Sequence, residues 1–266
     1  MVMQKAFMAS AFLKHWMRAE NRKGHGVHSP FVFDFIQTVL HDARHFYAFD
    51  DIEQVRTAAL QNQQVLNVTD FGAGSHTGAG HQRTVASIMK HAARTPAQGR
   101  FLFRLMQRYG YSTVVELGTS LGMGTSYLAS ANAAARIHTL EGCSNIAAQA
   151  QQHFNALQLK NIHSTQGNFD DTLLSVLQNI PSLDVFFVDG NHREEPTLRY
   201  FTMALPYMHE QGVMIFDDIH WSRGMQAAWE QIKQHPRVRL SLDLFYVGLV
   251  FFDPAFKEKQ DFSLFL

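Results

Sequence analysis

The 266-residue chain is long enough to bury a full hydrophobic core. Its 23 basic residues balance its 23 acidic ones, which disfavours a nucleic-acid substrate because such proteins need a basic surface. The single cysteine, Cys143, excludes an internal disulfide and favours a cytoplasmic location, and no apolar run approaches the roughly 20 residues of a membrane span.

The first 95 residues predict mainly helices. Met8, Phe12 and Trp16 recur at every fourth position, which is typical of an amphipathic helix and argues against a signal peptide. Ser29 and Pro30 have the residue types of a helix N-cap and first turn. We therefore expect a helical cap over residues 1–95, followed by a second domain over residues 96–266, with helices at 3–22, 30–40, 52–61 and 84–94.

From residue 113 onward, short apolar segments alternate with helical ones, which predicts a parallel sheet with right-handed crossovers. The expected fold class is α/β, with a Rossmann-like, seven-stranded, mostly parallel sheet covered by helices on both faces. The last two strands are joined by a short loop, which predicts a hairpin at the sheet edge. The expected strands are 113–117, 136–140, 162–165, 183–188, 213–216, 238–242 and 246–252, and the helices are 124–134, 145–157, 171–178, 194–208 and 223–234.

The sequence V-V-E-L-G-T-S-L-G-M-G at residues 114–124 predicts a buried strand, a glycine turn and a helix N-terminus. Such a turn lets a ligand approach the backbone, where free N–H groups and the helix dipole face it. Glu116 precedes the turn, and its carboxylate would repel a phosphate, which favours S-adenosylmethionine over a dinucleotide. The expected cofactor-binding residues of this segment are Glu116, Gly118, Thr119, Ser120, Gly122 and Gly124.

A second glycine-rich segment, D-F-G-A-G from Asp70, competes for the role of cofactor loop. A nucleotide-binding βαβ unit needs an acidic residue about 20 positions further on, at the end of the next strand. The strand that follows Asp70 begins too far away, whereas the strand after Gly118 ends in Glu141. We therefore expect Glu141 to bind the ribose hydroxyls, and the Asp70 segment to be a flap or a structural turn.

Polar residues follow the later strands, at the edge of the sheet where ligands bind in open α/β folds. Asn168 and Phe169 could contact an adenine, although Asn168 could instead cap the next helix. Asp189, Asp217 and Asp218 could likewise serve as turn or cap residues. Three converging carboxylates nevertheless repel one another unless a cation compensates them, and oxygen ligands of this kind suit Mg²⁺.

Two histidines lie beside these carboxylates in the sequence. His192 and His220 could act as general bases, since an imidazole titrates near neutral pH, or could be hydrogen-bonding wall residues. We place His192, His220 and Asp189 in the catalytic set, Asp189 also in the cofactor-binding set, and Asp189, Asp217 and Asp218 in the metal set.

Residues 97–252 resemble the class I S-adenosylmethionine-dependent methyltransferases, in particular the catechol-type O-methyltransferases and their cephalosporin-hydroxylase-like relatives. The resemblance is carried by V-V-E-L-G-T-S-L-G-M-G, Glu141, V-F-F-V-D-G-N-H ending at His192, and I-F-D-D-I-H-W containing Asp217 and Asp218. It implies a divalent metal on Asp189, Asp217 and Asp218. His192 stands where the catechol-type enzymes have a catalytic lysine, and Asp-Asp replaces their Asp-Asn pair.

The resemblance implies O-methylation of a small molecule, with in-line attack on the sulfonium methyl group and assistance from Mg²⁺. A homo-oligomer is compatible with these features. Two alternatives remain open: a non-catalytic protein that keeps the fold, and a nicotinamide-dependent oxidoreductase. Against the oxidoreductase, the chain lacks the Tyr-x-x-x-Lys pair of the short-chain dehydrogenases. An RNA methyltransferase would need a basic patch on its surface.

Overall fold

The computed structural model describes residues 2–19, 28–69 and 81–265, with side chains from residue 7 onward. Its internal contacts divide the chain into two compact units, one of residues 42–179 and one of residues 1–41 with 180–266. These units do not follow the predicted division at residue 95, and the helical cap over residues 1–95 stays a prediction. The glycine-rich segment that begins at Asp70 lies outside the described residues. No helix in the described ranges is long and apolar enough to cross a membrane.

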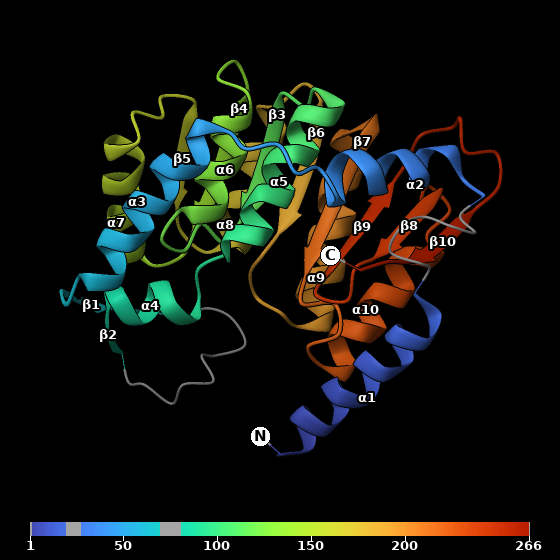
Figure 1. Cartoon of the computed structure of the whole chain (residues 1–266), viewed down its shortest axis with the longest axis horizontal. Helices are drawn as coiled ribbons and strands as arrows, with labels where there is room; N and C mark the ends of the chain where they lie inside the picture. The colour runs from blue at the N-terminus through green and yellow to red at the C-terminus, as the bar shows by residue number, and fades with distance from the viewer. Residues whose placement is uncertain (1, 20–27, 70–80, 266) are drawn as a thin grey trace. The chain divides into compact units, whose positions relative to one another are not determined.

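The unit of residues 42–179 contains a parallel three-stranded arrangement. In it β3 (Thr113–Leu117) pairs with β4 (Arg136–Glu141), and β4 pairs with β5 (Ile162–Gln166). Every residue of β3 is buried, as its apolar sequence predicts. A separate antiparallel pair joins β1 (Val65–Asn67) to β2 (Gln82–Thr84). The helices of this unit are α3 (Tyr47–Gln61), α4 (Val85–His91), α5 (Pro96–Tyr109), α6 (Met123–Ala131), α7 (Ser144–Ala156) and α8 (Phe169–Gln178) (Figure 1).

Local sequence signals set the ends of α5. The Thr95 hydroxyl accepts a hydrogen bond from the backbone N–H of Gln98 at 3.3 Å, and the Gln98 side chain accepts from the backbone N–H of Thr95 at 3.0 Å. This capping box satisfies backbone donors that the helix leaves open at its start. Gly110 ends the helix with φ +66°, a conformation that glycine adopts without steric cost.

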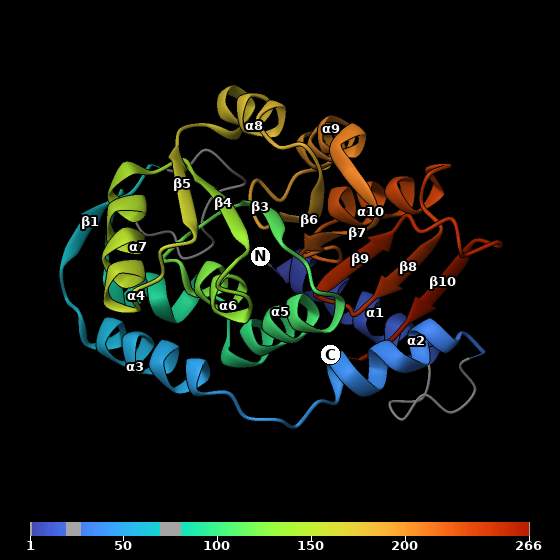
Figure 2. The same cartoon turned by 90° about the horizontal axis from the view of Figure 1, so that it is seen from above.

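The unit of residues 1–41 and 180–266 contains a mixed arrangement of strands. In it β6 (Leu183–Val188) runs parallel to β7 (Met208–Asp217), and β9 (Val247–Phe251) lies antiparallel to both β7 and β8 (Leu240–Asp243). The strand β10 (Gln260–Ser263) pairs in parallel with β8 (Figure 2). Its helices are α1 (Val2–Arg18), α2 (Pro30–Phe35), the π-turn Ile36–Leu40, α9 (Glu194–Ala204), the 3₁₀ turn Leu205–Tyr207 and α10 (Arg223–Gln234).

The predicted Rossmann-like, mostly parallel α/β fold is confirmed, with one correction to the strand count. The predicted hairpin exists as β8–β9, but β10 pairs with β8, so the hairpin does not lie at the edge and an eighth strand joins the predicted seven. The segment of β10 is short and partly exposed, with the sequence Q-D-F-S. It has neither the apolar run nor the alternation by which strands are recognised.

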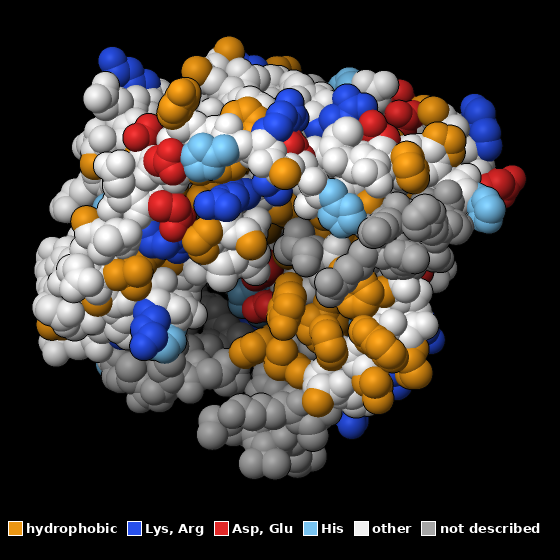
Figure 3. Space-filling view, viewed as in Figure 1, with side chains coloured by type: hydrophobic (Ala, Val, Ile, Leu, Met, Phe, Trp, Pro, Cys, Tyr) orange, Lys and Arg blue, Asp and Glu red, His pale blue; other side chains and the backbone are white. Residues whose placement is uncertain are grey.

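Helix α1 buries a small side chain and a polar one, and exposes large apolar ones. Its described buried residues are Ala11 and His15, which are four positions apart, whereas large apolar side chains on the helix are exposed. The helix was predicted from the spacing of Met8, Phe12 and Trp16, but this spacing marks an exposed stripe and not a core face. Hydrophobic side chains gather on the surface over α1 (Figure 3), and its exposed large ones are Phe12, Leu13, Trp16 and Met17.

The close packing of α5 against α6 predicts that replacing Gly99 destabilises the protein. A Cβ atom at Gly99 would lie 2.2 Å from the Tyr127 ring, and Tyr127 is itself fully buried. Gly99→Ala should therefore lower the free energy of unfolding by about 1–3 kcal/mol, as overpacking does, although alanine is the better helix former.

The matched control is Gly224→Ala in α10, where the nearest atom to the new Cβ would be an ordinary 3.4 Å away. This variant should be neutral or slightly stabilised. Urea unfolding of both variants checks the prediction, and equal effects at the two positions would contradict the close packing of Gly99 on Tyr127.

Candidate cofactor turn and metal-ligating clusters

The turn after β3 is held by its own backbone hydrogen bonds. The N–H groups of Gly118 and Thr119 both donate to the carbonyl oxygen of Leu140, at 2.9 and 3.3 Å, and the N–H of Gly122 donates to Thr119 at 2.9 Å. Gly118 and Gly122 have φ of +103° and +80°, where other residues are strained. At Gly122 a Cβ would also lie 2.4 Å from the Phe154 ring, so glycine is required twice over.

Glu116 is buried beneath this turn, with 1 % of its surface exposed. Its Oε2 accepts hydrogen bonds from the hydroxyls of Thr125 and Thr139, the latter at 2.7 Å, and Thr119 and Thr139 are joined hydroxyl to hydroxyl at 2.6 Å. Burial raises the pKa of Glu116 to about 7, although these two hydrogen bonds lower it. Glu116 thus holds the turn in place from its buried side. Thr125 and Thr139 belong to no recognisable motif, so the sequence alone does not identify them as its partners.

Glu141 ends β4 and reaches back to the same turn. Its Oε2 accepts from the backbone N–H of Ser120 at 2.9 Å, and its Oε1 accepts from that of Cys143 at 3.0 Å. The residue is only partly buried. The structure therefore brings Glu141 together with Ser120, as a site on this βαβ unit requires.

Asn168 is the N-cap of α8, and its side chain accepts from the N–H of Asp170 at 3.3 Å. The capping role considered from the sequence is thus present. Phe169 follows at the first position of the helix, where it is partly buried. Cys143 is buried, and its sulfur lies 3.5 Å from the carbonyl oxygen of Asn67.

In the other unit, Asp189, His192 and Asp217 form a group that we call the aspartate cluster. One ligand atom from each lies within 4.8 Å of the others, and Asp217 is buried while the other two are partly buried. Asp218, which was predicted as a third carboxylate ligand, does not belong to this group. Its backbone has φ +53° and donates to Tyr246, so the chain turns directly after Asp217.

His220 lies in a different group from His192. Its Nε2 is 2.8 Å from Oδ2 of Asp243, and His15 lies 3.2 Å from the other oxygen of the same carboxylate. His15, His220 and Asp243, which we call the histidine cluster, again place one ligand atom each within 4.8 Å of one another. Sequence reasoning singled out His220 but missed its partners, which lie 205 and 23 positions away in the chain.

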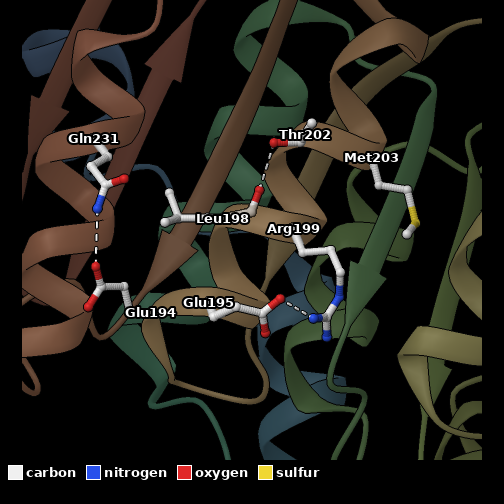
Figure 4. A pocket seen from close by; sticks show the side chains of 7 residues that line it. All are labelled: Glu194, Glu195, Leu198, Arg199, Thr202, Met203 and Gln231. Atoms are coloured by element: carbon white, nitrogen blue, oxygen red, sulfur yellow. Dashed lines mark hydrogen bonds and ion pairs between the residues drawn. The ribbon is translucent and has the colours of Figure 1, made fainter.

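A surface groove between α9 and α10 contains none of the predicted site residues (Figure 4). Its polar groups are engaged with one another: Glu195 pairs with Arg199 within α9, and Gln231 of α10 donates to Glu194 of α9 at 3.1 Å. The second contact joins the two helices, and we assign the groove no role in binding.

The raised pKa of Glu116 predicts a pH-dependent stability. Between the ordinary value of 4.5 and about 7, the unfolded chain ionises this carboxyl more readily than the folded chain, so stability falls as pH rises. Glu116→Gln keeps an acceptor for the hydroxyls but cannot ionise. Relative to the original protein, its free energy of unfolding should rise between pH 5 and pH 8 by roughly 1–3 kcal/mol, because a tenfold change in an acid dissociation constant corresponds to about 1.4 kcal/mol. Urea unfolding at both pH values measures this, and parallel pH profiles would show that Glu116 does not carry the effect.

Comparison with known proteins agrees with this geometry. Residues 115–219 match the profile of a family described as "Methyltransferase domain". An uncharacterized protein, R132, of Acanthamoeba polyphaga mimivirus is 27% identical over 74 residues, which are 26% of this chain and 34% of that protein. The match therefore spans about a third of the length of this curated relative.

Solved structures share the fold at low sequence identity. An O-methyltransferase from Bacillus cereus in complex with SAH is 22% identical with a TM-score of 0.55, over 83% of this chain and 97% of that one. The O-methyltransferase TomG from Streptomyces achromogenes, in complex with SAM, is 17% identical with a TM-score of 0.56, over 79% of this chain and 91% of that one. An SAH-bound Podospora anserina methyltransferase is 14% identical with a TM-score of 0.59, over 85% of this chain and 97% of that one.

The matched residues include β3 from residue 115 onward, the glycine turn, Glu141 and the aspartate cluster. The resemblance drawn from the sequence is thus confirmed: residues 115–219 match a methyltransferase-domain family, and the chain shares its fold with solved O-methyltransferases.

Proposed function

We propose that this chain transfers the methyl group of S-adenosylmethionine to an oxygen atom of a small molecule, assisted by a divalent cation on the aspartate cluster. The observation that carries the proposal is the turn after β3, closed by Glu141 at the end of β4. A cytoplasmic location, expected from the single cysteine, is part of the same proposal.

The hydrogen bonds of the turn favour this cofactor over a dinucleotide. A pyrophosphate is bound by free backbone N–H groups at a glycine turn and helix N-terminus. Here the N–H groups of Gly118, Thr119, Ser120 and Gly122 already donate to acceptors within the protein. With the carboxylate of Glu141 at the turn, the site suits a ligand that is rich in hydroxyl groups and carries no phosphate.

Glu141 has the acceptor capacity that a ribose diol needs. Its two oxygens are fixed by Ser120 and Cys143, so the carboxylate is held in one orientation before a ligand arrives. Carboxylate oxygens are the acceptors that the two hydroxyls of a ribose require. Such preorganisation lowers the entropic cost of binding.

S-adenosylmethionine, when bound, supplies an electrophilic methyl group on a sulfonium. The residues of the chain would hold donor and acceptor in an attack geometry, keep water away and receive the proton of the acceptor hydroxyl. His192 is the candidate for that proton, since its imidazole lies in the aspartate cluster, whereas His220 is buried against Asp243.

The aspartate cluster has donors that fit a divalent cation. Asp189 and Asp217 supply the carboxylate oxygens that Mg²⁺ and Mn²⁺ prefer, and these oxygens lie close enough together to bind one cation. A cation held by them would orient an acceptor oxygen and lower its pKa. We assign the metal to Asp189 and Asp217, and His192 to proton transfer.

Glu141→Gln tests the cofactor role. An amide offers one oxygen where the carboxylate offers two, so either a backbone N–H or a ribose hydroxyl loses its acceptor. Affinity for S-adenosylhomocysteine, measured by calorimetry, should fall about tenfold or more, as the loss of a hydrogen bond to a charged group predicts. Glu210→Gln on the exposed part of β7 is the matched control. Equal affinities of the two variants would remove Glu141 from the site.

The metal assignment predicts different effects of neighbouring substitutions. Asp217→Asn should weaken Mn²⁺ binding at least tenfold, because it removes a carboxylate ligand, whereas Asp218→Asn should leave it nearly unchanged. His192→Gln should also retain the metal if His192 acts in proton transfer. Electron paramagnetic resonance of added Mn²⁺ gives the three affinities, and a metal lost in Asp218→Asn but kept in Asp217→Asn would reverse the assignment.

A further inference from the structure

The histidine cluster is a second group of metal-ligating side chains, and it shares no residue with the aspartate cluster. His15 comes from α1, His220 from the segment after β7, and Asp243 from the end of β8. Relative exposures are 4 %, 7 % and 8 %. Three polar side chains from distant parts of one unit are thus buried together.

In neutral His15, the hydrogen bond to Leu264 leaves no proton for the contact with Asp243. Its Nε2 lies 2.9 Å from the carbonyl oxygen of Leu264, which can only accept, so Nε2 carries the hydrogen. In the neutral imidazole, Nδ1 then has a lone pair, and it faces Oδ1 of Asp243 at 3.2 Å. Two lone pairs at this distance repel each other unless a proton or a metal cation lies between them.

His220 adds a second unsatisfied nitrogen. Its Nε2 contacts Oδ2 of Asp243, while its Nδ1 is buried and has no hydrogen-bond partner among the described residues, as is also true of Nδ1 of His15. Asp243 thus faces one imidazole at each of its two carboxylate oxygens. The cluster therefore combines one negative charge with two nitrogen donors.

The packing of α1 is consistent with an anchoring role of this cluster, beside the edge-to-face contact of Phe12 with Phe245 at 5.0 Å. Apart from the small side chain of Ala11, the part of α1 whose side chains are described buries only His15, and Phe12, Leu13 and Trp16 are exposed. A helix that relies on hydrophobic burial would present the opposite face. A strong polar interaction at His15 would explain why the apolar stripe is left outside.

We propose that His15, His220 and Asp243 form a structural Zn²⁺ site that fixes α1 to the strand end of β8. Two imidazoles and one carboxylate are a donor set that Zn²⁺ takes, with a fourth position left for water, and imidazole ligands favour it over Mg²⁺. Binding would place the cation between Nδ1 of His15 and Oδ1 of Asp243, where the repulsion lies. The site is independent of the proposed methyl transfer.

Calorimetric titration of the untagged, chelator-treated full chain with Zn²⁺ tests the proposal. We expect one tight equivalent, and a thermal midpoint that rises with Zn²⁺, because a ligand of the folded state stabilises it. Asp243→Asn and His15→Gln should each weaken this equivalent at least tenfold and lose the thermal shift. Asp217→Asn, in the aspartate cluster, should keep both.

Three results would overturn the proposal. The first is the absence of a tight Zn²⁺ equivalent in the original protein, a measurement that needs no variant to fold. The second is binding that Asp217→Asn abolishes, which would assign the metal to the aspartate cluster. The third is binding that is insensitive to both substitutions of the histidine cluster, as adventitious binding to surface histidines would be. Replacement by Co²⁺ gives a further readout, since its visible absorption distinguishes a four-coordinate protein site from the hydrated ion.

Discussion

The buried carboxylate of Glu116 is the constraint on which the cofactor turn depends. A carboxyl group that is 1 % exposed must be hydrogen-bonded or protonated, and the hydroxyls of Thr125 and Thr139 satisfy it. These contacts tie the N-terminal end of α6 and the strand β4 to β3. The turn between them then has one shape, in which Gly118 and Gly122 adopt positive φ.

The hydrogen bonds of Glu116 give this residue a different role from the one expected from the sequence. From the sequence, Glu116 was expected to meet the ligand and repel phosphate. In the structure it contacts the protein itself, and the preference against phosphate comes instead from backbone N–H groups that already have acceptors. The partly exposed carboxylate of the segment is Glu141, at the end of the next strand.

The parts of the fold that the sequence predicts are those carried by local patterns. The strands β3 and β6 are short and mostly apolar, and the capping residues of α5 lie three positions apart. The strand β10 has no such pattern, because it exists only through its pairing with β8. Likewise His220 could be recognised near the carboxylates, but nothing in its neighbourhood indicates His15 or Asp243, which only tertiary folding brings to it.

The measurement that tests the central claim most directly is a calorimetric titration of the original protein with S-adenosylhomocysteine, beside a matched titration with NAD⁺. If the turn and Glu141 form an adenosyl site without a phosphate cradle, S-adenosylhomocysteine binds with one equivalent and NAD⁺ does not compete. Tight binding of NAD⁺ alone, or of neither compound, would contradict the account and favour an oxidoreductase or a non-catalytic protein with this fold.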